Sequence, residues 1–232
     1  MKVYLLRDEK VGPAGRSVPQ TQTPAKAAME ELLKGPTAQD DGAGLSTTIP
    51  SGTKLNNVSI DQGTATVDLS SEFGGGGGST SMQGRVAQVV YTLTQFSTVS
   101  AVNFELDGKA VTTLGGEGLV LDHPQTRADW ESFTPAILVE GPLPYDTITS
   151  PTHVTGTANT FEATFQIRLT DASGNKLSEH FATATSGTGT RGTFDETITF
   201  TTTSHGPATL TVYELSARDG SEINVVNVPV SL

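Results

Sequence analysis

Helical spacing of apolar residues is confined to the first half of this chain. Ala28, Met29 and Leu32 repeat at helical spacing within residues 24–33, and a second such pattern runs from about residue 79 to 95. From residue 135 onward the apolar residues alternate with polar ones in short segments separated by turn-forming residues. The chain is therefore predicted to hold an α+β domain followed by an all-β domain.

The first domain, residues 1–115, is predicted to follow a βαββαβ order. Its strands are expected at residues 3–6, 57–60, 64–69 and 99–106, with Asp61-Gln62-Gly63 as a hairpin turn between the second and third. Such an order gives a sheet with both helices on one face. In the strand 64–69, Thr64, Thr66 and Asp68 alternate with apolar residues, so they are expected on a polar face.

Two irregular segments interrupt this pattern. The five glycines of residues 74–78 predict a mobile loop, because no Lys-Ser/Thr follows them as in a phosphate-binding loop. Residues 116–134 are irregular and are predicted to form an interdomain linker. Trp130 and Phe133 are too large to be left in solvent without reason, so this linker is expected to pack against a domain.

The second domain, residues 135–232, is predicted to be an immunoglobulin-like β-sandwich. Seven strands are expected, at residues 136–140, 153–157, 161–170, 177–185, 193–202, 208–216 and 224–232. Seven short strands at this spacing are typical of that fold. Phe161 is expected as a core residue at the start of its strand, with Glu162 pointing outward as a candidate contact for a partner or glycan.

Charge and composition exclude several function classes. The formal net charge is −11. Residues 1–134 hold ten basic and fifteen acidic side chains (−5), and residues 135–232 hold four and ten (−6), so neither half is a basic nucleic-acid-binding module. The chain has no cysteine, which excludes disulfides and thiolate chemistry. No apolar run approaches the ~20 residues that span a bilayer.

The polar residues show no recognisable catalytic or metal-binding pattern, so no enzyme activity, metal or cofactor is predicted. The four histidines are widely spread, and no Gly-x-Ser-x-Gly motif precedes a helix. Asp68 and Glu72 are close in sequence and could serve acid–base chemistry or a weak calcium site. The favoured interpretation is structural, with the Asp68 carboxylate accepting hydrogen bonds from backbone N–H groups of the next turn.

Several stretches of the first domain resemble the GerM-type (GerMN) domain of bacterial sporulation and germination proteins. They are residues 27–36, 44–55, 58–73, 89–96 and 99–109, and the resemblance covers about residues 1–115. The remainder resembles the immunoglobulin-like domain of bacterial spore germination, which often follows a GerM-type domain. Its matching stretches are residues 137–142, 150–163 and 220–230.

This resemblance implies an exported protein, often a lipoprotein at the outer face of the bacterial membrane. The GerM-type fold is similar to ring-building modules of secretion and sporulation machines, which self-associate through helix and sheet faces. Neither family brings an established set of catalytic residues. The chain lacks an acylated cysteine, and a strand follows directly after Met1, so we hypothesise that an N-terminal export or anchor segment has been removed.

The sequence therefore predicts a non-catalytic, extracytoplasmic module for protein interaction or assembly at the cell envelope. Its partners are expected to be envelope proteins or further copies of the chain, with no nucleic acid, and membrane attachment only through a missing anchor. The candidate contact residues are Thr64, Thr66, Asp68, Trp130 and Glu162. The alternative is a module that binds peptidoglycan or a surface glycan, stacking sugar rings on Trp130, Tyr145 or Tyr213.

Overall fold

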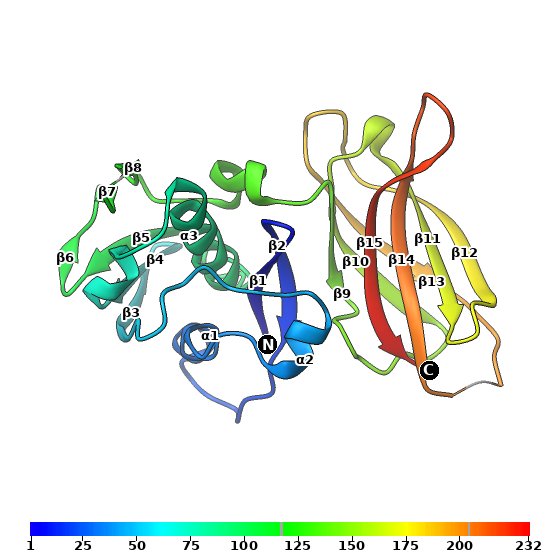
Figure 1. The fold of residues 1–232 in the computed structure, drawn as a ribbon, viewed down its shortest axis with the longest axis horizontal. Helices are drawn as coiled ribbons and strands as arrows, with labels where there is room; N and C mark the ends of the chain where they lie inside the picture. Colours follow the sequence, from blue (N-terminus) through cyan, green and yellow to red (C-terminus); the bar gives the residue numbers. More distant parts are fainter. Residues whose placement is uncertain (117, 204) are drawn as a thin grey trace. The chain divides into compact units, whose positions relative to one another are not determined.

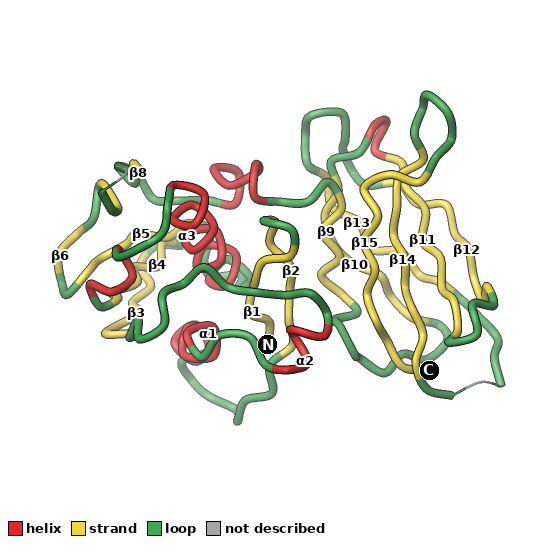
Figure 2. Tube along the Cα trace, in the orientation of Figure 1, coloured by secondary structure: helices red, strands yellow, loops and turns green. Residues whose placement is uncertain are grey.

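A computed structural model describes residues 1–116, 118–203 and 205–232 (Figure 1). These residues divide into two units, which we call unit 1 (Met1–Phe133) and unit 2 (Thr134–Leu232). Figure 2 shows that helices and strands are mixed in unit 1, whereas strands dominate unit 2. The predicted α+β domain followed by an all-β domain is confirmed.

Unit 1 is built around a four-stranded sheet in the order β3-β4-β5-β6, in which only β4 and β5 are parallel. Its elements are β1 (Lys2–Arg7), β2 (Lys10–Gly15), α1 (Pro24–Leu33), α2 (Ala38–Gly42), β3 (Leu55–Asp61), β4 (Thr64–Leu69), η1 (Ser71–Gly74), α3 (Ser79–Leu93), β5 (Ala101–Leu106), β6 (Lys109–Ala110), β7 (Thr113–Leu114), β8 (Leu119–Val120) and η2 (Arg127–Phe133). The two long helices and the central strands follow the sequence prediction closely.

The first strand differs from the βαββαβ expectation in its partner. β1 pairs with β2 in a hairpin of its own, although no strand was expected over the residues of β2. The turn between them places Asp8 and Glu9 at positive φ, as a tight hairpin turn requires. Every residue of α3 from Gly84 to Leu93 is buried. Because this stretch is buried on all sides, it must be covered by more than one other element. The hairpin supplies part of that cover, and the Tyr4 N–H donates to Thr92 Oγ1 at 3.0 Å.

The short helix α2 is fastened by a buried ion pair. Asp40 and Thr37 form a capping box at its N-terminus, and Arg16 Nη2 lies 2.6 Å from Asp40 Oδ2. Burial by itself raises the pKa of Asp40, but hydrogen bonds from Arg16 and Thr37 outweigh it, so the pKa is lowered. The ionised Asp40 carboxylate therefore connects α2 with Thr37, which precedes this helix, and with Arg16, which follows β2.

This pair predicts an acid-sensitive contribution to the stability of unit 1. Because the folded state lowers the pKa of Asp40, its contribution is present above the unfolded pKa and is lost as pH falls through the folded pKa. Between about pH 6 and about pH 3, the free energy of unfolding should fall less for Asp40→Asn than for the wild-type chain. Urea unfolding at each pH, followed by the fluorescence of Trp130, measures this difference.

Trp130 suits that measurement because it is the only tryptophan in the chain and is buried in unit 1. Asp41→Asn is the matched control, because Asp41 also lies in α2 but outside this ion pair. Parallel pH profiles for the wild type and Asp40→Asn would contradict the prediction.

Residues 116–133, predicted as most of an interdomain linker, fall within unit 1. The backbone N–H of Gln125 donates to the carbonyl oxygen of Val102 on β5, and the N–H of Val102 donates to the carbonyl oxygen of Gln125. The Arg127 guanidinium lies 4.5 Å from the ring centre of Tyr91 and 5.3 Å from that of Tyr4. Trp130 is buried as well. These contacts make the segment part of the packed structure of unit 1.

Unit 2 is a sandwich of a three-stranded sheet, β13-β10-β9, and a four-stranded sheet, β12-β11-β14-β15. Its elements are β9 (Ile137–Gly141), β10 (Thr152–Ala158), η3 (Phe161–Ala163), β11 (Thr164–Asp171), β12 (Lys176–Thr183), β13 (Gly192–Ile198), β14 (Pro207–Leu215) and β15 (Glu222–Ser231). Alternate apolar residues fill the space between the sheets, and the rings of Phe165 and Phe194 meet there at 4.7 Å. The seven predicted strands are all present.

Candidate functional site

The polar side of strand β4 belongs to a broader polar surface of unit 1. Thr64, Thr66 and Asp68 are half-buried, whereas Ala65 and Val67 between them are fully buried on the opposite side. Strand pairing places residues of β3 and β5 beside them. We call the resulting surface the sheet face, and it comprises Asn57, Ser59, Asp61, Thr64, Thr66, Asp68, Asn103 and Glu105. All of these residues are exposed or half-buried.

Asp68 also has a structural role within this surface. Its Oδ1 accepts the N–H of Gly108 at 3.0 Å and the side-chain amide of Asn56 at 3.4 Å. The carboxylate therefore holds a turn, as expected, but the turn is the one between β5 and β6, forty residues further along the chain. Glu72 lies in η1 with a lowered pKa, chiefly because Ser70 donates a hydrogen bond to it.

The glycine run has an internal partner that sequence reasoning missed. Arg85 on α3 is 2% exposed, and its guanidinium donates to the carbonyl oxygens of Phe73, Gly75 and Gly76 at 2.7–2.9 Å and to Ser81 Oγ at 3.1 Å. Burial lowers the pKa of Arg85. Arg85 is the only charged residue in α3, and this lone cation was the sequence signal that could have indicated its role.

Trp130 is not a surface platform. It is 5% exposed and meets the ring of Phe133 edge-on at 6.1 Å. Tyr213 is 4% exposed and lies beneath the Arg168 guanidinium, which is 4.7 Å from its ring centre. Of the three aromatic residues considered for sugar stacking, Tyr145 alone presents its ring to solvent. These positions give no support to the glycan-binding alternative through Trp130 or Tyr213.

Glu162 is exposed, as expected, but Phe161 is exposed too, and the prediction of a core Phe161 was wrong. The chain forms the turn η3 before β11 begins, with Glu162 and Ala163 at positive φ. The N–H of Phe161 donates to Glu214 Oε1 at 2.8 Å, which holds this turn beside β14. The core position is taken by Phe165, which is 1% exposed. Glu162 lies in unit 2, whereas the sheet face lies in unit 1.

Three histidines pair with carboxylates on the surface. His153 meets Asp195 at 2.8 Å, and His180 meets Glu196 at 3.1 Å. His123 meets Asp122 at 2.9 Å, and its pKa is raised, chiefly by that hydrogen bond. Over the described ranges 1–116, 118–203 and 205–232, no three His, Asp or Glu side chains are grouped to hold a metal ion.

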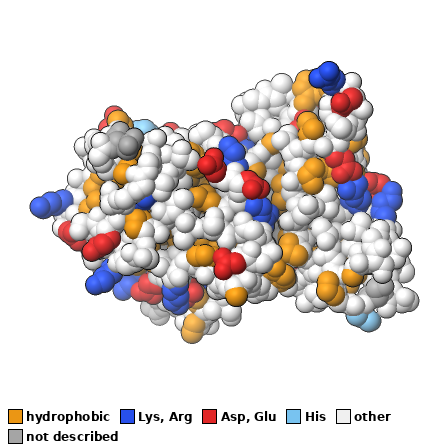
Figure 3. Space-filling model, viewed as in Figure 1, with side chains coloured by type: hydrophobic (Ala, Val, Ile, Leu, Met, Phe, Trp, Pro, Cys, Tyr) orange, Lys and Arg blue, Asp and Glu red, His pale blue; other side chains and the backbone are white. Residues whose placement is uncertain are grey.

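Surface charge shows no concentration of one sign on the face seen in Figure 3. Lys and Arg side chains (blue) are scattered there among Asp and Glu (red), with no continuous basic patch. Among the helices of the described residues, none is both long and apolar enough to cross a bilayer. The face drawn in Figure 3 therefore lacks the clustered cations that phosphate backbones require.

Two family models match the chain, one in each unit. Residues 2–112 match the model described as "Sporulation and spore germination", and residues 136–221 match "Immunoglobulin-like domain of bacterial spore germination". The comparison with curated proteins gave no match.

Two solved structures from Bacillus subtilis are similar to parts of the chain. The first GerMN domain of the sporulation protein GerM is 29% identical, with a TM-score of 0.48, covering 56% of this chain and 99% of that one. The tandem GerMN domains of GerM are 22% identical, with a TM-score of 0.49, covering 85% of this chain and 60% of that one.

Proposed function

Because the chain joins a sporulation and spore germination domain to an immunoglobulin-like domain of bacterial spore germination, we propose that it is a non-catalytic interaction module of the bacterial cell envelope. In this proposal it acts outside the cytoplasm, in an assembly related to sporulation or germination. The sheet face of unit 1 contacts a neighbouring protein subunit.

The observation that carries this proposal is the exposure of one side of a regular sheet. Threonine, serine and asparagine side chains on neighbouring strands offer hydroxyl and amide groups at regular spacing across the sheet face. Such a surface is preorganised, because its strands are fixed by the buried side of the same sheet. Binding to it therefore requires little ordering of the chain.

Charge indicates which partner surface fits. Asp61, Asp68 and Glu105 lie on the sheet face, and none of its residues is Lys or Arg. Two copies meeting sheet face to sheet face would bring like charges together, which is unfavourable. The partner surface is therefore expected to carry Lys or Arg, either on an envelope protein or on a different side of another copy.

Thr66→Arg tests this proposal, because Thr66 lies at the middle of β4 and is half-buried. The substitution places a bulky cation at the centre of the contact and should abolish whichever contact the wild-type chain makes, concentration-dependent self-association or capture of envelope proteins. Light scattering over a concentration series measures the first, and pull-down from envelope extracts measures the second. Raising the salt concentration should weaken the wild-type contact, because charge pairs at the rim are screened.

Thr164→Arg is the matched control, because Thr164 is a half-buried threonine on β11 of unit 2, outside the sheet face. It should leave association and capture unchanged. A wild-type chain that stays strictly monomeric at high concentration and captures no envelope protein would refute the proposed function. Equal losses from Thr66→Arg and Thr164→Arg would refute the assignment to the sheet face.

A further inference from the structure

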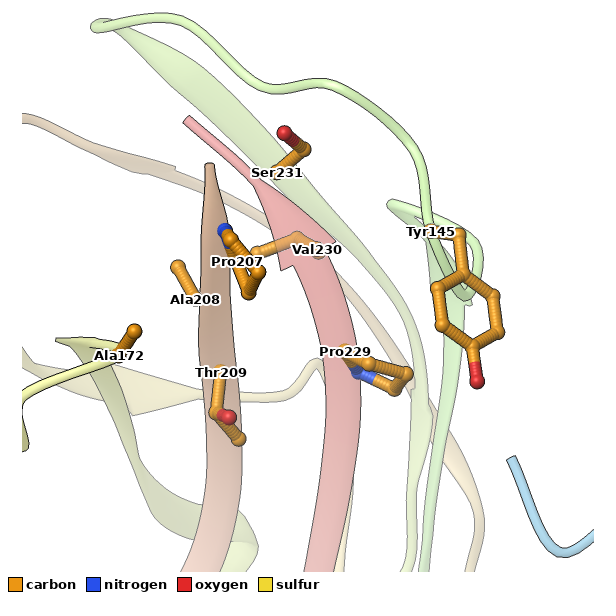
Figure 4. A pocket seen from close by; sticks show the side chains of 8 residues that line it. All are labelled: Tyr145, Ala172, Pro207, Ala208, Thr209, Pro229, Val230 and Ser231. Carbon is orange, nitrogen blue, oxygen red and sulfur yellow. The ribbon is translucent and has the colours of Figure 1, made fainter. Parts of the chain in front are cut away.

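Unit 2 carries a surface pocket of about 310 Å³ where β14 begins and β15 ends (Figure 4). Pro207, Thr209, Pro229 and Ser231 lie along these two paired strands. Figure 4 shows Ala172 beyond β14 and the ring of Tyr145 beyond β15, so these two residues border the pocket on opposite sides. The lining is completed by Ala208 and Val230.

The aromatic side of the pocket is held firmly in place. Tyr145 has a φ of +69°, a conformation that a residue with a bulky side chain adopts only when its surroundings impose it. Its N–H donates to the carbonyl oxygen of Pro229 at 2.6 Å, and the N–H of Ser231 donates to the carbonyl oxygen of Asp146 at 2.9 Å. These bonds fasten the loop to β15 while the Tyr145 ring remains 39% exposed.

The chemistry of the lining favours a ligand with flat apolar surfaces and few hydrogen-bonding groups. Two proline rings and one tyrosine ring supply apolar surface, whereas Thr209, Ser231 and Tyr145 supply only hydroxyl groups. A sugar ring carries several hydroxyls, and this lining has no carboxylate or amide side chain to pair with them. A segment in the polyproline II conformation loses little entropy on binding and is recognised by aromatic-lined grooves.

The charged residues next to the pocket indicate what charge the ligand should carry. Asp146 follows Tyr145 and Asp171 precedes Ala172, so each border has an acidic residue next to it in the chain. The Asp146 carboxylate accepts the N–H of Leu143, and the Asp171 carboxylate accepts the N–H groups of Ser173 and Asn175, so each is fixed in its own turn. The pKa of Asp171 is lowered from an ordinary value that is already far below neutral pH, chiefly by the Asn175 side-chain hydrogen bond, so this carboxylate is ionised at neutral pH. None of the eight lining residues is Lys or Arg. An occupant with basic residues on either side of its apolar part complements this arrangement.

We propose that this pocket binds a proline-rich polyproline II segment of another protein that is flanked by basic residues. The site lies in unit 2 and is independent of the assembly surface proposed for unit 1. Tyr145 packs against the proline rings of the segment. Asp146 and Asp171 attract the flanking cations.

Fluorescence anisotropy of the full chain with a labelled peptide of six prolines, with two arginines at each end, tests the proposal. A peptide in which glycine and serine replace the prolines keeps the charges and removes the polyproline II conformation. The proline peptide should bind saturably and at least about tenfold more tightly than this control, as expected when aromatic packing carries the affinity.

Variants then locate the site. Tyr145→Gly removes the ring and suits a positive φ, so the fold should be retained while the proline peptide binds about tenfold more weakly. Asp146→Asn should weaken binding a few-fold and reduce its salt dependence. Phe181→Ala is the matched control, because Phe181 is 59% exposed on β12 outside the pocket, and it should leave the affinity unchanged.

Three results would overturn the proposal. The first is equal affinity for the proline and glycine–serine peptides, which would indicate charge attraction alone. The second is unchanged binding by Tyr145→Gly. The third is saturable binding of a hexamer of N-acetylglucosamine that Tyr145→Gly abolishes, which would make the pocket a glycan site. The association tests of Thr66→Arg are separate, so either proposal can fail alone.

Discussion

Replacing Arg85 by methionine is expected to lower the free energy of unfolding of unit 1 by about 3 kcal/mol. The guanidinium holds three backbone carbonyl oxygens and one hydroxyl beneath the glycine run. Methionine has a similar length but no donors, so the carbonyl oxygen of Phe73 would lose its buried partner. Urea unfolding followed by Trp130 fluorescence measures the loss in unit 1.

Arg85→Lys should fall between the wild type and Arg85→Met, because one ammonium group cannot reproduce the planar fork of a guanidinium. Arg218→Met is the matched control, because Arg218 is exposed in unit 2 and its removal should cost nothing measurable in unit 1. A buried cation also carries a desolvation cost, which methionine removes. Unchanged or increased stability of Arg85→Met would contradict the prediction and show that this cost equals or exceeds the contribution of the hydrogen bonds.

Gly156→Ala is expected to destabilise unit 2 by about 3 kcal/mol or more, or to prevent its folding. Gly156 lies in β10, the middle strand of its sheet. A Cβ at this position would lie 2.1 Å from the carbonyl oxygen of Leu138 and 2.7 Å from Phe194 Cζ. The carbonyl belongs to the neighbouring strand β9, so relief requires the two strands to separate.

Gly174→Ala separates this clash from ordinary backbone strain in the same unit. Gly174 has a φ of +81°, and a Cβ there would meet nothing within 4 Å, so alanine should cost only about 1 kcal/mol. Circular dichroism during urea unfolding detects the strands of unit 2, and Trp130 fluorescence should show an unchanged transition in unit 1. Equal costs for Gly156→Ala and Gly174→Ala would rule out the clash.

The sequence predicted some helices and strands correctly. Each of them shows a periodic pattern of apolar residues within its own segment. Repeats of three and four residues define α1 and α3, because one stripe of each helix must be buried whatever covers it. Alternation in β4 likewise separates a buried side from a polar side before any partner strand is known. The periodicity of these segments therefore carried the prediction of an α+β first domain.

The errors concern residues whose environment comes from distant parts of the chain. The residues Lys10–Gly15 contain a proline and two glycines and resemble a loop, yet they form β2 because α3 needs further cover. Phe161 matched the strand alternation, but a turn held by Glu214 displaced it into solvent. Neither Glu214 nor α3 is close in sequence to the residues that it affects.

Among the candidate contact residues, too, local patterns predicted some positions correctly, whereas others depend on distant parts of the chain. Thr64, Thr66 and Asp68 were found from alternation alone, and the structure places them together on the sheet face. Trp130 was also considered as an exposed platform, but it is buried in η2 of unit 1, which agrees with the expectation that its segment packs against a domain. The pocket beside Tyr145 combines segments that are widely separated in sequence, so no local pattern could indicate it.

The sequence by itself determined the two-domain organisation, the main helices and strands, and which side of β4 is polar, because periodicity and turn residues act within a few residues of the chain. Only the tertiary structure decided that carbonyl oxygens of the glycine run bind Arg85, that Phe161 is exposed and that Tyr145 borders a pocket. Burial and hydrogen bonding of these residues depend on partners brought together by folding, and a linear pattern does not specify those partners.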